Sequence, residues 1–343
     1  MFWKKLIGVK ADFNHFIYEV TPSCNHDCSY CYNVWKYREY PQGQLLDLRQ
    51  WQEVTERLME QTNIGTVSIS GGEPTIYPDL VVLIKYLRSK KINVNLLTNG
   101  SNIIEDLARE LVDLDISIFE IPLVAIDKEL HKKLKGRDDY DQVVKGIANL
   151  TSLGATVVSV LVATKDNIDQ SAEVAELSMV LGCRGMMFNR INPANKKQIA
   201  LIPSIEQIKS ALAKLDIISN KYNFSISCSV PIMPCLIDMK NYKNLSYGYC
   251  PAGGKRSYPV IDYLGNVRVC NHSPKILGNI LAKDLDDIFS KSEYFQNFKN
   301  SFADKCQKCS LVKECKGGCR AAAEVCYGCL TDLDPMARER GSF

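Results

Sequence analysis

The chain has 343 residues, of which 46% are hydrophobic and 24% are charged, a length that favours one large domain with a smaller one beside it. Lys and Arg number 42 and Asp and Glu 39, so the net charge is only +3, and no basic block predicts binding to a nucleic acid. The N-terminus lacks a signal-peptide core, and the longest apolar run, residues 155–163, is about half as long as a membrane-spanning helix must be. We therefore expect a soluble, cytoplasmic protein that does not enter a membrane.

Short apolar segments rich in β-branched residues alternate with longer segments whose apolar residues have helical spacing. The predicted strands lie at residues 16–21, 66–70, 93–97, 115–121, 156–164 and 185–191. The predicted helices lie at residues 47–62, 78–90, 101–112, 140–154, 169–182 and 204–221.

This alternation predicts parallel strands joined by right-handed crossovers. Six strand–helix units are fewer than the eight of a closed barrel. The predicted fold is therefore α/β, an open, partial (β/α)6 barrel of the TIM type over residues 16–222, with its active site at the carboxyl ends of the strands. Residues 1–15 are expected to form an N-terminal extension, and residues 223–343 a second, cysteine-rich domain.

The cysteines are numerous and unevenly distributed. Of the fourteen, three lie between residues 24 and 31, one is Cys183, and ten lie between residues 228 and 329. In a reducing compartment, clustered cysteines bind metal more often than they form disulfides. The distribution therefore predicts two separate metal-binding regions.

The first region has the spacing C-x3-C-x2-C, with Cys24, Cys28 and Cys31 directly after the first predicted strand. Cubane iron–sulfur clusters normally take four thiolates, so three would leave one iron open to a small molecule. The alternative is part of a zinc site that is completed elsewhere in the chain. The sequence GGEP, residues 71–74, follows the second predicted strand, so it should meet the cysteines at the same end of the barrel. By itself, GGEP could also be a simple turn.

Taken together, this cysteine triplet and GGEP resemble the radical SAM superfamily. The resemblance implies that Cys24, Cys28 and Cys31 hold a [4Fe-4S] cluster whose open iron binds S-adenosyl-L-methionine (SAM). Reductive cleavage of SAM would then give a 5′-deoxyadenosyl radical that removes a hydrogen atom from a substrate. An electron donor such as flavodoxin or ferredoxin would be required.

The resemblance also implies residues that contact SAM. Those expected at its methionine end are Gly71, Gly72, Glu73 and Pro74. Glu73 would pair with the ammonium group, and Tyr30 would lie beside the adenine.

Two further residues near this end are candidates for the site. Asn99, after the third predicted strand, is a candidate cofactor neighbour or a simple turn residue. Arg190, at the end of the sixth, is expected to face a carboxylate of the cofactor or substrate, the alternative being a surface arginine. After the fourth strand the family often carries a polar S-x-D-G-like segment near the ribose, whereas this chain has Pro122 and Leu123.

The second cysteine region begins with a predicted hairpin between Cys250 and Cys270 that turns at residues 264–266. It continues with the spacing C-x2-C-x5-C-x3-C, formed by Cys306, Cys309, Cys315 and Cys319. This region resembles the SPASM extension, which holds two auxiliary [4Fe-4S] clusters; a zinc ribbon with spare thiols is the alternative.

The SPASM resemblance implies how these cysteines are shared. The first auxiliary cluster would take Cys250, Cys270 and Cys319. The second would take Cys306, Cys309 and Cys315. Each cluster then lacks one ligand.

For the first cluster we expect Cys235 as the fourth ligand, ahead of Cys228, because it is nearer in sequence and follows two prolines; an open iron that binds substrate is the alternative. For the second, the family usually supplies a D-P-x-C cysteine, but Ala337 occupies that position. A predicted helix at residues 320–325 that ends at Gly328 would leave Cys329 free to turn back, so we expect Cys329 as the ligand, rather than Cys326.

SPASM-type proteins resemble enzymes that mature ribosomally made peptides or activate sulfatases, and similar architectures act on tetrapyrrole precursors. We therefore expect a peptide- or protein-modifying radical enzyme. The alternatives are a radical enzyme acting on a small cofactor precursor and a non-catalytic electron carrier, against which GGEP argues. The chain begins about fifteen residues before the first strand, so we expect either a separate peptide-recognition protein or a non-peptide substrate.

Overall fold

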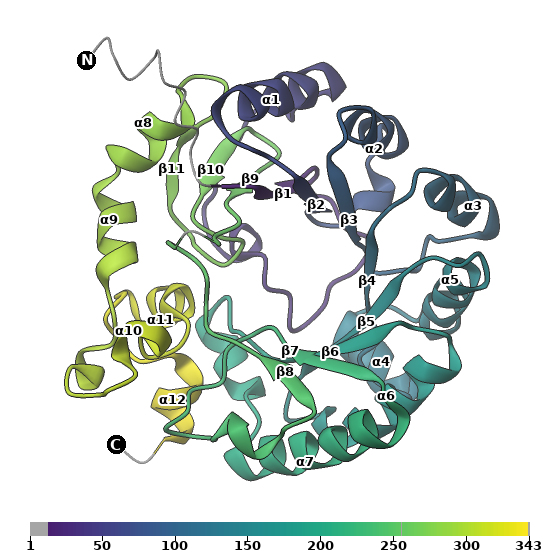
Figure 1. Ribbon diagram of the computed structural model, residues 1–343, viewed down its shortest axis with the longest axis vertical. Helices are drawn as coiled ribbons and strands as arrows, with labels where there is room; N and C mark the ends of the chain where they lie inside the picture. Colours follow the sequence, from purple (N-terminus) through teal and green to yellow (C-terminus); the bar gives the residue numbers. More distant parts are fainter. Residues whose placement is uncertain (1–12, 255, 342–343) are drawn as a thin grey trace.

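The computed structural model describes residues 13–254 and 256–341, so most of the expected N-terminal extension lies outside the described residues. Within them, the strands form one 11-stranded sheet with the order β11-β10-β9-β1-β2-β3-β4-β5-β6-β7-β8. The sheet curves into an open arc, and helices cover its outer side (Figure 1). No helix among these residues is long and apolar enough to cross a lipid bilayer.

The strands from β1 to β8 pair in parallel, in chain order. They are β1 His15–Glu19, β2 Thr66–Ser70, β3 Asn93–Leu97, β4 Ile118–Pro122, β5 Val157–Ala163, β6 Gly185–Arg190, β7 Ser225–Cys228 and β8 Leu245–Tyr247. At the other edge, β9 pairs in parallel with β1, and the hairpin continues antiparallel. Its strands are β9 Val260–Ile261, β10 Asn266–Arg268 and β11 Ile276–Asn279.

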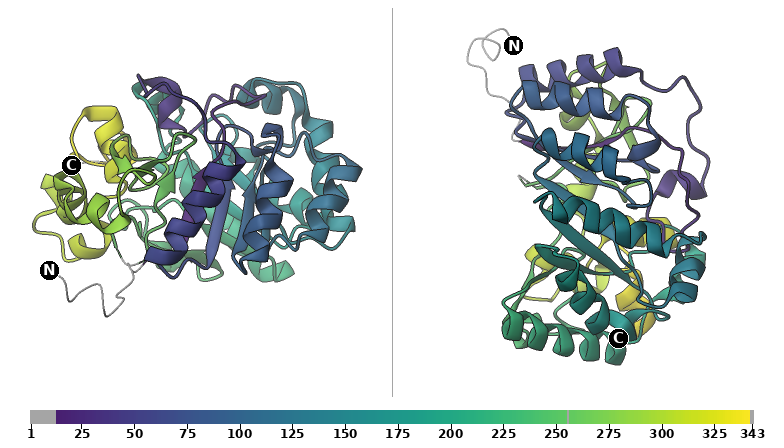
Figure 2. Two further views of the ribbon diagram at one scale, coloured as in Figure 1. Left: turned by 90° about the horizontal axis from the view of Figure 1, so that it is seen from above. Right: turned by 90° about the vertical axis from the view of Figure 1, so that its right-hand side faces the viewer.

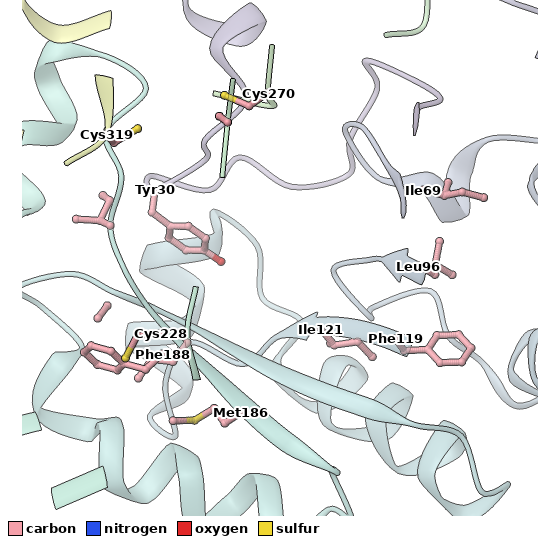
Figure 3. Close-up of a cluster of buried hydrophobic side chains, with 14 of the residues drawn as sticks. Tyr30, Ile69, Leu96, Phe119, Ile121, Met186, Phe188, Cys228, Cys270 and Cys319 are labelled. Carbon is pink, nitrogen blue, oxygen red and sulfur yellow. The ribbon is translucent and has the colours of Figure 1, made fainter. Parts of the chain in front are cut away.

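Seven helices connect the parallel strands along the described chain. They are α1 Leu48–Gln61, α2 Leu80–Ser89, α3 Glu105–Asp113, α4 Lys128–Lys135, α5 Tyr140–Ser152, α6 Ser171–Val180 and α7 Ile205–Tyr222. Capping boxes at Asp47 and Ser204 satisfy the first amides of α1 and α7 and fix where these helices begin. The side chains that point from the strands to the helices are fully buried, as Figure 3 shows for Ile69, Leu96 and Phe119.

Five short helices follow the hairpin. They are α8 Leu285–Ser290, α9 Glu293–Asn300, α10 Val312–Cys315, α11 Arg320–Tyr327 and α12 Pro335–Arg340. They lie between the two ends of the sheet, β11 and β8 (Figure 1), and Figure 2 shows them on the side opposite α3 and α5. The C-terminal segment therefore spans the opening that the partial barrel leaves.

The predicted partial barrel is confirmed, with every predicted strand and helix found within a few residues of its expected position. The predicted hairpin is also confirmed, and Gly265 takes the positive φ of 81° that its turn requires. Two features of the structure differ from these predictions. Helix α4, whose sequence KELHKKLK has little apolar character, was not predicted. The sheet also continues through the short polar strands β7 and β8, so it does not stop at the expected domain boundary after residue 222.

Two buried ion pairs join the barrel to the C-terminal segment. Glu19 of β1 accepts hydrogen bonds from Arg268 of β10 and from the indole of Trp35. Arg190 of β6 pairs with Asp334, the cap of α12, with 2.5 Å between Nη2 and Oδ2. Both members of each pair are at most 1% exposed.

The expectation that Arg190 faces a carboxylate of the cofactor or substrate is therefore wrong in this structure. Its Nε donates to the carbonyl of Pro231 at 2.8 Å, its Nη1 to that of Ile191 at 3.3 Å, and its Nη2 to Asp334. The residue is also not a surface arginine, because it is only 1% exposed. The carboxylate partner comes from far along the chain, which is why the strand-end position alone did not reveal it.

A double-mutant cycle tests this structural role. Arg190→Ala leaves the Asp334 carboxylate buried without its partner and should cost about 3–5 kcal/mol of unfolding free energy. Asp334→Ala should cost a similar amount, and the double variant should cost less than the sum of the two. The measurement is the urea unfolding midpoint under anaerobic conditions. Arg109→Ala, which breaks an exposed pair with Glu105, is the control and should cost less than about 0.5 kcal/mol. Additive effects of Arg190→Ala and Asp334→Ala would contradict the pairing.

Candidate functional site

The loop that follows β1 carries Cys24, Cys28 and Cys31 at the carboxyl end of the strand. Cys24 is exposed, and the other two are half-buried. Burial raises the pKa of Cys28 to about 12, and the neighbouring Cys31 and Cys24 raise it further while Lys135 lowers it. Three thiolates are therefore stable together here only beside added positive charge, which bound iron supplies.

This loop is held from two sides. The Ser29 amide donates to the carbonyl of Leu134, in the last turn of α4, at 2.9 Å. From the segment after β6, Gln198 Nε2 donates to the carbonyls of Ser29 and Cys31 at 2.9 and 3.0 Å. Both anchors lie outside the cysteine motif in sequence, and together they fix its backbone.

The GGEP turn touches the cysteine loop through backbone atoms. A Cβ on Gly72 would lie 2.0 Å from the Ser23 carbonyl oxygen, and one on Gly71 would lie 2.6 Å from that of Thr21. The Gly72 amide donates to the Thr21 carbonyl at 2.7 Å, and the Glu73 amide to that of Ser23 at 2.9 Å. The prediction that the two motifs meet in space is thus confirmed, and glycine is required because any side chain would separate the loops.

The carboxylate of Glu73 is buried and oriented by the chain itself. Its Oε1 accepts from the amide and hydroxyl of Thr75 at 3.0 and 2.7 Å and from the hydroxyl of Thr98 at 2.6 Å. Its Oε2 accepts only the Asn99 amide, at 2.7 Å. Because Oε1 is saturated, Oε2 is the atom with acceptor capacity left for an ammonium group. Pro74 then begins a short 3-10 helix, Pro74–Ile76.

Asn99 and Tyr30 lie next to this turn and the cysteine loop. Asn99 Nδ2 donates to Oδ1 of Asn25 in the cysteine loop at 2.7 Å, and its own Oδ1 accepts from Ser101. Asn99 therefore connects the loop after β3 to the cysteine loop, which is more than the role of a simple turn residue. Tyr30 is buried, with its ring pointing into the interior (Figure 3). Their contacts with SAM remain predictions.

A buried charge network beneath the cysteine loop was not predicted. Lys135, at the end of α4, is fully buried and donates through Nζ to the Asn99 carbonyl at 3.1 Å. Burial lowers the pKa of Lys135, whereas Cys28, Asp139 and Glu73 oppose this shift. Asp139 also accepts from His26 of the cysteine loop, so the network joins this loop to the segment from Lys135 to Asp139. The network places one cation beside the thiols.

The inner face of the barrel is polar in its middle. Ser68 of β2 is aligned with Asn95 of β3, and its Oγ contacts His15 Nε2 at 2.8 Å and Asn95 Nδ2 at 3.4 Å. Along β4, Phe119 and Ile121 are fully buried, while Glu120 between them faces the other way and is half-buried. The inner face of these strands therefore carries polar side chains, whereas the opposite face of β4 is apolar.

The carboxylate of Glu120 has no hydrogen-bond or ion-pair partner among the described residues. Burial raises its pKa to about 7. Its charge raises the pKa of both Tyr32 and Tyr258, although burial of these tyrosines is the larger cause. Cys250 and Cys270 also raise the pKa of Tyr258, so Tyr258 is near both Glu120 and the hairpin cysteines. The one sequence signal for this site was an acid in the middle of a predicted barrel strand.

Cys250, Cys270 and Cys319, which the SPASM resemblance assigns to one cluster, lie near one another, and their role as ligands remains a prediction. Burial raises the pKa of Cys270 to about 12, and Cys250 and Cys319 add to the shift. The sulfur atoms of Cys270 and Cys319 point toward one another (Figure 3). The sulfur of Cys319 also accepts a hydrogen bond from Nδ2 of Asn192, at 3.3 Å.

Cys235 does not join this group. It lines one small cavity together with the three cysteines Cys306, Cys309 and Cys315. The expectation that Cys235 completes the first auxiliary group is therefore wrong. Closeness in sequence to Cys250 was misleading, because the chain between them returns to the sheet as β8. Cys228, the other candidate, is buried beside Phe188 in the core (Figure 3).

Cys329 was expected to complete the second group, but it does not line the cavity. Gly328 does end α11 in a left-handed conformation, with φ of 90°, as predicted. Cys329 then turns outward and is exposed. Its sulfur lies 3.2 Å from the hydroxyl oxygen of Thr331. Cys326 is fully buried on α11, where it packs as a small apolar side chain.

Within the described residues, no three His, Cys, Asp or Glu side chains converge closely enough to hold a single metal ion. Four thiolates of a cubane cluster bind four different irons, so they stand farther apart than the ligands of one zinc ion.

A glycine substitution tests the contact between the two loops. Gly72→Ala places a Cβ against the Ser23 carbonyl, so the loops must separate at a cost of about 1–3 kcal/mol. The displaced cysteine loop should also retain less iron after anaerobic reconstitution. Gly248→Ala is the control, since nothing lies within 4 Å of its Cβ position. The thermal unfolding midpoint and the iron content measure both effects, and equal values for the two variants would contradict the contact.

Two family models match the chain. The Radical SAM superfamily matches residues 18–177, and the SPASM iron-sulfur cluster-binding domain matches residues 250–319. The first match covers both the cysteine loop and GGEP, and the second runs from the first hairpin cysteine to Cys319.

Named relatives extend the similarity over most of the chain. The mycofactocin maturase MftC of Mycolicibacterium smegmatis is 27% identical over 318 residues, which cover 89% of this chain and 77% of the relative. The PqqA peptide cyclase of Bradyrhizobium diazoefficiens is 24% identical over 337 residues, which cover 92% and 84%.

Among solved structures, Streptococcus suis SuiB bound to precursor peptide SuiA matches with a TM-score of 0.73 at 17% identity, covering 94% of this chain and 74% of that one. That likeness shows a shared fold. With its two domain matches, the chain belongs to the radical SAM superfamily as a SPASM-type enzyme that uses SAM and iron–sulfur clusters.

Proposed function

We propose that this enzyme modifies a ribosomally made peptide or a protein, using a radical derived from SAM. The support comes from relatives named as a mycofactocin maturase and a PqqA peptide cyclase, each matched over about nine-tenths of this chain. The structural observation that carries the proposal is the carboxylate of Glu120 on the inner face of β4, which has no hydrogen-bond partner among the described residues.

The chain's own residues fit the cofactors. Cys24, Cys28 and Cys31 would hold the cluster that binds SAM, Oε2 of Glu73 would accept the ammonium group, and Gly71 and Gly72 would give the cofactor close backbone access. When bound and reduced, this pair supplies a 5′-deoxyadenosyl radical that removes a hydrogen atom from the substrate.

Further residues act on the cofactor and the substrate. Buried Lys135 offsets the negative charge of three thiolates and fixes the Asn99 carbonyl. Tyr30 would cover the adenine. Glu120 would orient a substrate N–H or O–H group and take up a proton, since a carboxyl with a pKa near 7 changes its protonation at neutral pH.

The proposal includes partners outside the chain. A flavodoxin or ferredoxin in the cytoplasm would supply the electron that reduces the cluster. A separate peptide-recognition protein would deliver the substrate.

Removal of the cysteine loop's thiols tests the catalytic centre. Three cubane clusters give about twelve irons per chain, and changing Cys24, Cys28 and Cys31 together to Ala should remove about a third of them. The variant should form no 5′-deoxyadenosine under anaerobic reduction. Cys183→Ala is the control, because Cys183 is buried outside all three groups and should keep both iron and activity. Cofactor cleavage by the triple variant would overturn the assignment.

The peptide substrate is tested by mass spectrometry. The reconstituted enzyme is incubated with SAM, a reductant and short peptides encoded beside its gene. A mass change in one peptide, accompanied by 5′-deoxyadenosine, is the expected result. Conversion of a small-molecule precursor, with no peptide changed, would contradict the proposal.

A pH profile tests Glu120. Product formation should rise with pH through about 7 as the carboxyl ionises and becomes able to accept a proton. Glu120→Gln should remove this rise and lower product formation by about 10²-fold or more, while 5′-deoxyadenosine formation without substrate stays within about twofold. Tyr32 and Tyr258 remain neutral in this range because their pKa values are raised, and burial lowers that of His15. The exposed Glu110→Gln is the control, and an unchanged profile in Glu120→Gln would exclude this role.

A further inference from the structure

We propose that Cys235 is the fourth ligand of the second auxiliary cluster and that it replaces a cysteine missing at the position of Ala337. The cavity lined by Cys235, Cys306, Cys309 and Cys315 is also lined by Ala337 itself. A thiolate cluster needs four sulfur ligands around one space, and among the described residues these four cysteines share one.

The position of Ala337 explains why a replacement is needed. Ala337 lies in the first turn of α12, two residues after Pro335, and is 1% exposed. In the SPASM pattern this D-P-x-C position supplies a cysteine. Helix α12 therefore places residue 337 at the cavity, but the methyl side chain of Ala337 cannot bind iron.

The turn that carries Cys235 is built to present its side chain. The carbonyl of Met233 accepts the amides of Leu236 and Ile237 at 2.9 and 3.1 Å, which closes a tight turn around Pro234 and Cys235. Met233 and Ile237 are buried at its two ends, while Cys235 is exposed. A turn anchored by apolar neighbours on both sides holds its central thiol in one place without burying it.

The facing segment presents the other three thiols. The Cys309 amide donates to the carbonyl of Cys306 at 2.9 Å, so the first two cysteines sit in one turn. Gly317 follows with φ of 79°, and a Cβ there would lie 2.5 Å from that of Ala303 and 3.4 Å from the sulfur of Cys306. The glycine thus lets the chain reverse beside the thiols. Consistent with their proximity, Cys235 raises the pKa of both Cys306 and Cys315, after burial.

The two rival cysteines are placed elsewhere. Cys329 is exposed beside Thr331 and does not line the cavity. Cys326 is fully buried on α11, with its sulfur 4.0 Å from the Pro193 carbonyl. Neither reaches the three facing thiols without unwinding part of α11 or its end.

Iron content and cluster spectra of the reconstituted full-length enzyme test the proposal. Cys235→Ala should lose between about one and four of about twelve irons, because a three-thiolate cluster loses its unligated iron or falls apart. An electron paramagnetic resonance signal of a three-iron cluster would report the partial loss. Cys329→Ala is the matched control, an exposed cysteine whose removal should leave iron and spectra unchanged.

A second variant, in which the cysteine ligand is moved to residue 337, distinguishes the loss of a ligand from misfolding. The double variant Cys235→Ala, Ala337→Cys should recover the lost iron, because residue 337 lines the same cavity. Full iron in Cys235→Ala, or loss in Cys329→Ala instead, would overturn the assignment, as would a double variant that stays depleted. Formation of 5′-deoxyadenosine at the first cluster, measured in parallel, separates a wrong ligand from a wrong function.

Discussion

The buried carboxylate of Asp334 is the interaction on which the arrangement of barrel and clusters depends. Its Oδ2 accepts from Arg190 at the end of β6 and from the Cys319 amide at the start of α11, at 2.5 and 2.8 Å. Its Oδ1 caps α12 through the Met336 amide at 2.8 Å. One side chain thus holds a barrel strand, a ligand of the first auxiliary group and the helix that reaches the second. An unpaired charge in such a place would cost several kcal/mol, so these elements are coupled energetically.

The two faces of the barrel sheet have different roles. The outer face is apolar and packs against helices, whereas the inner face carries Ser68, Asn95 and Glu120 along adjacent strands. Successive strand residues point to opposite sides, so a single substitution changes either packing or the lumen, and seldom both. This separation lets the lumen be fitted to a substrate while the scaffold remains stable.

Most of the fold and the first cysteine motif could be predicted from the sequence, because the patterns that indicate them are local. Helix caps, strand alternation and the spacing of Cys24, Cys28 and Cys31 each lie within one short segment, and parallel topology brings strand ends to one edge. The predictions that were wrong depended on contacts between distant segments of the chain. Arg190 and Asp334 are 144 residues apart, and Cys235 meets cysteines some seventy residues further on rather than its nearer neighbour Cys250. Lys135 and Glu120 were overlooked because a lysine in a charged run and an acid in a strand show no sign of burial in sequence.

The pairing of β9 with β1 has a consequence for the passage of electrons. Cys270 follows β10, which pairs with β9, and the cysteine loop follows β1, so both sites are attached to one hydrogen-bonded sheet. Tunnelling rates fall steeply with separation, and two sites on separately moving domains would exchange electrons only in their closest approach. Backbone hydrogen bonds across β1 and β9 remove that motion. Electron transfer between the barrel and the hairpin group would then proceed at a separation that the paired strands hold fixed.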